Sequence, residues 1–264
     1  VEGTKDTVAA IGAADLRAYV ARILARGRLK IAVVGDIDAA TLGPRLDAIF
    51  GALPAKPELK EIADIQVADG PARRIGDMDI PQTVIRFGRP GIARKDPDFI
   101  AAYIVNHILG GGGFSSRLYA EVREKRGLAY SVFSALYPLD HAPVLYGAVG
   151  TRNDRAAESL KVIQDEISRL GEQGPSEQEL AAAKAYLTGS YALRFDSSGK
   201  IASELVGIQL EDLGIDYINK RNDLIDAVTI EDVRRVAKRL LAGDKMIAAI
   251  VGRPEGLEEI RPGG

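Results

Sequence analysis

The chain has 264 residues, of which 46% are hydrophobic and 27% are charged, a balance typical of a globular protein with room for one large domain or two small ones. Its 35 basic and 37 acidic residues leave a formal net charge of −2, which gives no indication of a nucleic-acid partner. Cysteine is absent, which excludes disulfides and thiolate sites, and no apolar run approaches the roughly 18 residues that a membrane-spanning helix needs.

The first 53 residues predict two helices around one buried strand. Apolar residues at helical spacing predict a helix over residues 13–26. The run 29–35, Leu-Lys-Ile-Ala-Val-Val-Gly, predicts a buried strand, and Asp38 is placed to cap a second helix that ends near Phe50. These elements are too few for a domain, so we interpret residues 1–53 as the tail of an N-terminal α+β domain. Because Val1 is neither an initiator Met nor part of a signal sequence, we expect the natural protein to begin upstream.

Residues 54–72 contain three prolines and weak periodicity, which predicts a linker. The pattern of elements restarts after it, and residues 73–260 are interpreted as a C-terminal α+β domain. Strands are predicted at 73–79, 82–89, 128–137, 143–151 and 246–252. Helices are predicted at 97–109, 115–126, 153–172, 176–195, 198–212 and 215–226, with a last helix after Thr229.

A short sequence echo links the two parts of the chain. Lys-Ile-Ala-Val-Val-Gly at 30–35 resembles Lys-Met-Ile-Ala-Ala-Ile-Val-Gly at 245–252, and each follows a predicted helix. This weak internal repetition favours two related α+β domains, of which the first is truncated. The expected fold class is α+β, with a mixed or antiparallel sheet packed with helices.

The histidines argue against a zinc site in this chain. A helical zinc motif needs two histidines three or four residues apart, but the only two, His107 and His141, are far apart in sequence. We interpret His107 as a helix histidine near the core and His141 as a surface loop residue. No metal site is expected.

The segment 110–116, Gly-Gly-Gly-Gly-Phe-Ser-Ser, is glycine-rich and leads into a helix. Such a loop can bind phosphate, but it follows a helix rather than a strand and lacks the Gly-Lys-Ser/Thr ending of a phosphate-binding loop. We therefore interpret the glycines as the end of one helix, with Ser115 or Ser116 capping the next. A flexible loop beside a cleft is the alternative.

Arg123 and Tyr130 form the strongest candidate for chemistry. Arg123 stands on a predicted helix that ends at Gly127, and Tyr130 lies early in the following strand. This order can bring a guanidinium and a phenol to one cleft edge, where both are donors to a carbonyl or an oxyanion. The alternative is that Arg123 is one charge on a solvated helix face and Tyr130 a half-buried strand aromatic.

These residues carry a family resemblance. Gly-Gly-Gly-Phe-Ser-Ser-Arg-Leu-Tyr followed by Arg-Glu-Lys-Arg-Gly-Leu-Ala-Tyr resembles the C-terminal domain of pitrilysin/insulinase-like zinc metallopeptidases, which include the mitochondrial processing peptidases. The spacing matches the family's Arg/Tyr pair, carried here by Arg123 and Tyr130. Segments around Gly3 and Asp36 resemble the tail of the family's N-terminal domain, so the resemblance spans nearly the whole chain.

The resemblance implies two homologous α+β domains, within or between subunits, that form a clamshell around a peptide chamber. The family's zinc motif, H-x-x-E-H with a further Glu, lies in an N-terminal domain, while the Arg/Tyr pair holds the substrate backbone at the scissile bond. The expected function is therefore the substrate-binding half of a zinc endopeptidase, inactive as this chain alone. We expect Arg123 and Tyr130 to be catalytic and Gly112, Gly113, Ser116 and Arg117 to bind substrate.

The absent zinc residues leave two explanations open. The zinc motif can lie in an upstream region of the parent chain, or in a zinc-bearing partner subunit of a homo- or heterodimer. A non-catalytic scaffold subunit and a peptide-binding module that pairs with an extended peptide at a strand edge are alternative functions of the same fold. The resemblance suggests the bacterial periplasm as the compartment, with the cytoplasm as the alternative.

Overall fold

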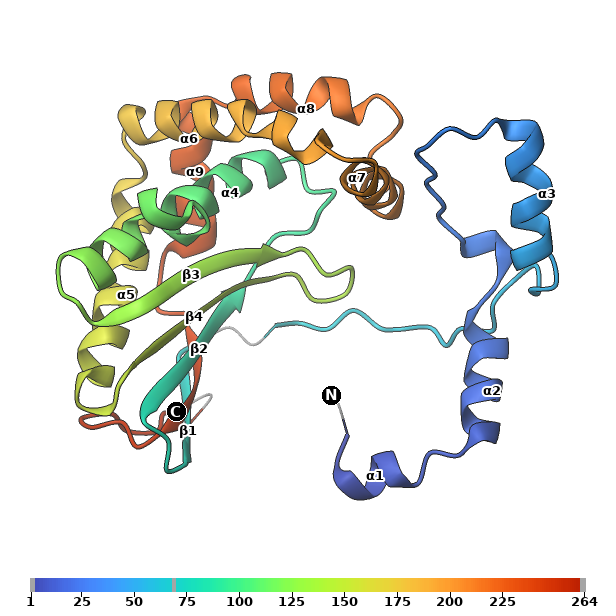
Figure 1. Ribbon diagram of the computed structural model, residues 1–264. Coiled ribbons are helices and arrows are strands. Elements are labelled where there is room, and N and C mark those ends of the chain that lie inside the picture. Colours follow the sequence, from blue (N-terminus) through green and yellow to red (C-terminus); the bar gives the residue numbers. More distant parts are fainter. Residues whose placement is uncertain (1–2, 68–69, 262–264) are drawn as a thin grey trace. The chain divides into compact units, whose positions relative to one another are not determined.

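The computed structural model of the protein describes residues 3–67 and 70–261. These residues divide into two units (Figure 1). Unit 1 contains the described residues up to 62 together with 192–217, and unit 2 contains the described residues of 63–191 and 218–264. Unit 1 is thus built from two stretches that are far apart in the sequence. The division expected from the sequence assigns residues 192–217 to the C-terminal domain.

Unit 1 is mainly helical. Its helices are α1 (Lys5–Ala9), α2 (Ala13–Ile23), α3 (Ala39–Phe50) and α7 (Ser198–Leu210). The predicted helix over residues 13–26 is confirmed as α2, which ends three residues earlier. Asp38 caps α3 as predicted, because its Oδ1 accepts a 2.7 Å hydrogen bond from the backbone N–H of Thr41. This bond and the capping geometry lower the pKa of Asp38.

The predicted strand at residues 29–35 is wrong for this structure. The segment is extended but lies in no sheet, and the carbonyl of Ile31 accepts its hydrogen bond from the side-chain amide of Gln209 at 3.1 Å. The hydrophobic pattern is present, yet Ile31 and Val33 are 37% and 45% exposed. A strand needs a neighbour that pairs with its backbone N–H and C=O groups, and the described residues of unit 1 supply none.

Unit 2 contains a five-stranded mixed sheet in the order β1-β5-β2-β4-β3. Its strands are β1 (Ala72–Asp77), β2 (Gln82–Pro90), β3 (Ala129–Tyr137), β4 (Val144–Arg152) and β5 (Ile247–Gly252). β1 and β5 run parallel and the other neighbouring pairs are antiparallel. The predicted strands are confirmed within a few residues at each end.

Helices cover one face of this sheet (Figure 1). They are α4 (Phe99–Asn106), α5 (Ala156–Gln173), α6 (Glu177–Gly189), α8 (Tyr217–Asp226) and α9 (Ile230–Leu241). Side chains of β2 alternate between the covered face and the other face: Ile85 and Phe87 are buried, and Val84 and Arg86 are exposed. The core therefore lies between the sheet and the helices, and the expected α+β class is confirmed.

Two segments depart from α-helical geometry beside the covered face. The helix predicted at 97–109 forms α4 and then continues as a π-helical turn over His107–Gly111. The helix predicted at 115–126 begins after Ser116 and becomes π-helical over Tyr119–Glu124. No helix of the described residues is both long and apolar enough to cross a membrane.

Candidate functional site

The π-helical turn Tyr119–Glu124 carries Arg123 and stands against strand β3. The helical segment that contains it begins at Ser116, whose carbonyl accepts from the backbone N–H of Ala120 at 3.0 Å, and in the π-turn itself the carbonyl of Ala120 accepts from the N–H of Lys125 at 3.0 Å. The segment ends at Gly127, whose φ of 60° is a left-handed conformation that glycine adopts without steric cost. The chain then enters β3 directly, which explains how a helix residue and a strand residue reach the same place. Single π-turns within helices are frequent at functional sites.

Arg123 and Tyr130 are brought together. The Arg123 guanidinium carbon lies 4.6 Å from the centroid of the Tyr130 ring and 4.9 Å from that of Tyr119. Such distances give cation–π attraction on both sides of the guanidinium. Tyr130 is 80% exposed, whereas Tyr119 is 9% exposed. The alternative interpretation of Tyr130 as a half-buried strand aromatic therefore does not hold.

Three of the charged residues around Arg123 are paired with each other. Glu121 binds Lys125 and Arg126, each at 2.6 Å, and these hydrogen bonds lower the pKa of its carboxyl group. The Arg123 guanidinium forms no hydrogen bond or ion pair within the described part of the chain, although the Arg123 carbonyl accepts from the backbone N–H of Gly127 at 2.9 Å. Its N–H groups are therefore available to another molecule, while its ring contacts restrict where they point.

Two aromatic residues of this site were not predicted from the sequence. The Tyr119 ring contacts the Arg123 guanidinium, and Phe114 packs edge-on against Tyr119 with ring centroids 4.9 Å apart. Phe114 is 76% exposed. The four-residue spacing of Tyr119 and Arg123 is a sequence signal for Tyr119, since side chains four apart meet on a helix. Phe114 has no comparable signal, because its contact depends on the turn over Gly113–Ser115.

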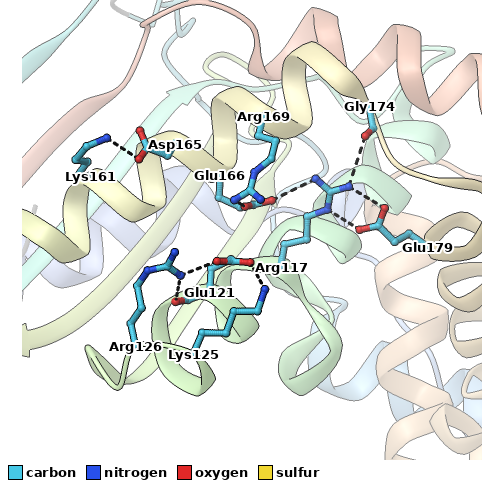
Figure 2. A network of polar contacts seen from close by, with 10 residues as sticks. All are labelled: Arg117, Glu121, Lys125, Arg126, Lys161, Asp165, Glu166, Arg169, Gly174 and Glu179. Atoms are coloured by element: carbon cyan, nitrogen blue, oxygen red, sulfur yellow. Dashed lines mark hydrogen bonds and ion pairs between the residues drawn. The ribbon is translucent and has the colours of Figure 1, made fainter.

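A network of ion pairs lies beside the π-turn (Figure 2). Arg117 bridges Glu179 at the start of α6, at 2.5 Å, and Glu166 in α5, at 3.2 Å. Glu166 also pairs with Arg169. Burial raises the pKa of Glu166 in spite of Arg169 and Arg117. Burial also opposes ionisation of Glu179, but hydrogen bonds from Arg117 and Ser176 outweigh it and lower the pKa of Glu179 to about 2. The network joins three helical segments next to the candidate site.

The four predicted substrate-binding residues are placed differently from Arg123 and Tyr130. Ser116 is fully buried, and its hydroxyl donates to the carbonyl of Gly113 at 2.7 Å rather than capping the next helix. The Arg117 guanidinium forms ion pairs with Glu166 and Glu179. Gly112 and Gly113 lie in the loop before Ser116, Gly113 with a φ of 58°. Substrate contact by these four residues stays a prediction, and here the side chains of Ser116 and Arg117 serve the fold.

The histidines take the positions expected of them. His107 is 7% exposed and stacks on Tyr186 with ring centroids 5.1 Å apart. Burial lowers the pKa of His107, so the ring is neutral at pH 7. His141 lies in the loop after β3, where its Nδ1 is 2.9 Å from Asp64. The described residues contain no group of three or more His, Asp or Glu side chains placed to hold a metal ion.

The arrangement offers two kinds of donor on one exposed edge. The Arg123 guanidinium presents several N–H groups in a plane, and the Tyr130 hydroxyl is exposed beside it. Both can donate to a carbonyl oxygen or to a negative charge that develops on it. This arrangement suits the binding of a carbonyl group and the stabilisation of negative charge on its oxygen.

Comparisons with known proteins agree with the resemblance seen in the sequence. An uncharacterized zinc protease of Streptomyces coelicolor is 33% identical over 262 residues, which cover 96% of this chain and 56% of the relative. The beta subunit of the mitochondrial-processing peptidase of Blastocladiella emersonii is 26% identical, with 97% of this chain and 56% of the relative covered. The chain thus spans a little over half the length of these relatives.

A solved structure and a family model give the same assignment. The crystal structure of a peptidase M16 inactive domain from Pseudomonas fluorescens matches with a TM-score of 0.86 and 30% identity, over 99% of this chain and 61% of that one. The family model of the peptidase M16 inactive domain matches residues 10–187. With the Arg123–Tyr130 geometry and the α+β sheet in place, the resemblance to zinc metallopeptidases is confirmed, and the chain belongs to the family of peptidase M16 inactive domains.

Proposed function

We propose that this chain is the substrate-binding half of a zinc-dependent endopeptidase. In this role Arg123 and Tyr130 hold the peptide backbone at the scissile bond and stabilise the negative charge that forms on the carbonyl oxygen. The observation that carries the proposal is the Arg123 guanidinium, which is held between two tyrosine rings at 4.6 and 4.9 Å and has no ion-pair partner among the described residues.

Each side chain has a separate part in the proposal. The rings of Tyr119 and Tyr130 restrict the rotamers of Arg123, so that less conformational entropy is lost when its N–H groups bind a peptide carbonyl. The Tyr130 hydroxyl adds an O–H donor at the end of an exposed ring. The pair acts by orientation and electrostatics.

The described residues do not offer a site for the zinc ion of this family, because they contain no suitable cluster of ligands. We therefore derive no step through the metal. We propose that zinc is held elsewhere, either in another part of a longer parent chain or in a zinc-bearing partner subunit. Metal analysis of the parent protein, alone and after co-purification with partners, distinguishes the two locations.

Substitutions of the pair test the proposal in the assembled enzyme. We expect Arg123→Ala and Tyr130→Phe each to lower turnover of a peptide substrate by about 10²-fold, the scale on which the loss of one oxyanion donor acts. A matched control is the Arg22–Tyr19 pair of α2, whose guanidinium carbon lies 5.8 Å from the ring centroid. Arg22→Ala and Tyr19→Phe are expected to leave turnover unchanged.

Unchanged turnover in both site variants would exclude the proposed role. A non-catalytic scaffold would then be the better interpretation, because such a subunit has no use for the exposed Arg123–Tyr130 pair. Dimer formation and a periplasmic compartment are further proposals that rest on the family resemblance alone. Analytical ultracentrifugation and cell fractionation of the parent protein test them.

A further inference from the structure

Phe114 is 76% exposed, more than any other phenylalanine of the protein. Its ring is held by Tyr119, against which it packs edge-on with ring centroids 4.9 Å apart. The Tyr119 ring in turn contacts the Arg123 guanidinium. Phe114 therefore lies one ring away from the group that, in the proposed function, binds the peptide backbone.

The turn that carries Phe114 is fixed by local hydrogen bonds. Gly113 has a φ of 58°, which a residue with a Cβ adopts only at a steric cost. The hydroxyl of Ser115 donates to the carbonyl of Gly112 at 3.0 Å. The carbonyl of Gly113 accepts from the hydroxyl of Ser116 at 2.7 Å and from its backbone N–H at 3.1 Å. An exposed aromatic residue is thus held in one backbone conformation, which reduces the entropy that a contact with another molecule costs.

The distance from Phe114 to Arg123 corresponds to a short stretch of peptide. Both residues and Tyr119 belong to unit 2, so the distances between them do not depend on unit 1. Two contacts of 4.9 Å each link the Phe114 centroid to the Arg123 guanidinium carbon through the Tyr119 ring, so the two are no more than about 10 Å apart. A contact of Phe114 with a large side chain spans about 4.5–7 Å of this distance. The remainder is about one residue of an extended peptide, at roughly 3.3 Å per residue.

The geometry of an extended peptide limits which side chain reaches Phe114. Adjacent side chains point to opposite sides of the peptide, so only one of the two residues that flank the scissile bond faces the ring. A large apolar side chain at this position removes apolar surface of both partners from water, whereas glycine leaves the ring exposed. A carboxylate would lose water there and meet the negative face of the ring.

We propose that Phe114 is a specificity-determining residue of the peptidase, and that it selects peptides with a large apolar side chain on one of the two residues that flank the scissile bond. The inference rests on the proposed function and deepens it by naming the class of substrate. Arg123 and Tyr130 act on the peptide backbone, which is the same in every sequence. Phe114 contacts a side chain, and therefore distinguishes one sequence from another.

Mapping of cleavage sites tests the inference on the assembled enzyme. Mass spectrometry identifies the fragments that the enzyme releases from an unfolded protein of known sequence. We expect Phe, Tyr, Leu and Met to be enriched about tenfold at one of the two flanking positions, the lower end of the range over which a hydrophobic site discriminates between side chains. In Phe114→Ala the enrichment at this position is expected to fall below about twofold.

Two synthetic peptides separate selection from mere support of the site. One has the sequence around a mapped cleavage site, and the other has Gly at the enriched position. We expect Phe114→Ala to lower the ratio of their kcat/KM values about tenfold. Phe114→Leu keeps an apolar side chain and is expected to retain most of the ratio. Circular dichroism checks that each variant is folded.

The matched control is Tyr137→Ala. Tyr137 is a partly exposed ring in the same kind of edge-on contact, with its centroid 5.6 Å from that of Tyr146. It ends β3, roughly 23 Å along the strand from Tyr130. This variant removes an aromatic side chain of the same unit away from the site, and it is expected to keep both the enrichment and the ratio.

An unchanged ratio in Phe114→Ala would overturn the inference, because Phe114 would then only support Arg123 or pack against another part of the assembled enzyme. Absence of enrichment at both flanking positions in the unaltered enzyme would overturn it as well, and an assembled enzyme that cleaves no peptide would overturn both proposals. Arg123→Ala separates the two. Its loss of turnover without selection by Phe114 would leave the proposed function in place. Full turnover in Arg123→Ala, with selection lost in Phe114→Ala, would remove the role of Arg123 and keep that of Phe114.

Discussion

Replacing Arg117 by Met is the sharpest test of what holds the candidate site in place. The guanidinium joins Glu179 and Glu166 from two different helices, and its side chain is 20% exposed. Loss of one partner of a buried ion pair costs about 3–5 kcal/mol when the charge left behind has no other partner. Here Glu166 keeps Arg169, and the side chain of Glu179 is 30% exposed. We therefore expect a loss of about 2–3 kcal/mol in the free energy of unfolding.

The melting temperature gives a direct measurement of this loss. For a unit of this size, 1 kcal/mol shifts the melting temperature by roughly 2–4 °C, so Arg117→Met is expected to melt about 5–10 °C lower. The control is Arg152→Met, which breaks the solvent-exposed pair with Asp154 and is expected to leave melting unchanged. Adding Glu179→Gln to Arg117→Met should restore part of the loss, because it neutralises the carboxylate that has lost its guanidinium and keeps an oxygen that accepts from Ser176. A wild-type melting temperature in Arg117→Met would refute the reasoning.

Two further predictions concern stability near the site. The pKa of Glu179 is lowered to about 2, below the value of roughly 4.3 expected in the unfolded chain. The ionised side chain of Glu179 therefore contributes fully to the free energy of unfolding above about pH 4.3, and this contribution is lost as the pH falls toward 2. Urea unfolding at pH 7, 4 and 2.5 should show that Glu179→Gln destabilises the protein at pH 7 and has little effect at pH 2.5; an equal effect at all three would contradict this. Gly127→Ala should cost about 1–2 kcal/mol in urea unfolding, because φ is 60° and no heavy atom lies within 4 Å of the added Cβ, so the cost is backbone strain alone. Gly127→Asn, which tolerates this conformation better, should cost less.

Much of the local structure could be predicted from the sequence. The run 82–89 is predicted as a strand and forms β2, but its buried face carries the polar residues Thr83 and Arg89 besides Ile85 and Phe87, so the pattern identifies the strand and not its buried face. Asp38, and Thr229 with Asp232, are capping signals that mark the first residues of α3 and α9. These signals act over three or four residues, so the surrounding fold does not alter them.

The failed strand at residues 29–35 shows where such reasoning ends. Its hydrophobic pattern equals that of Ile247–Gly252, which does form β5. The difference is that β5 lies between β1 and β2, whereas the earlier segment has no neighbouring strand among the described residues. A segment forms a strand only where a second strand lies beside it, and the pattern of the segment itself does not show whether that partner is present.

Part of the candidate site follows from the local sequence, and part of it depends on tertiary contacts. The spacing of Arg123 and Tyr130 around Gly127 already indicates that helix and strand residues can meet, because a left-handed glycine reverses the chain there. That Arg117 is internal depends on its contacts with Glu166 and Glu179, which are distant in the sequence. The amino-acid sequence by itself determined most of the elements and the caps of α3 and α9, because these follow from neighbours along the chain. The tertiary structure alone decided which arginines are paired and which face solvent, because a charge is compensated by whatever side chain the fold places beside it.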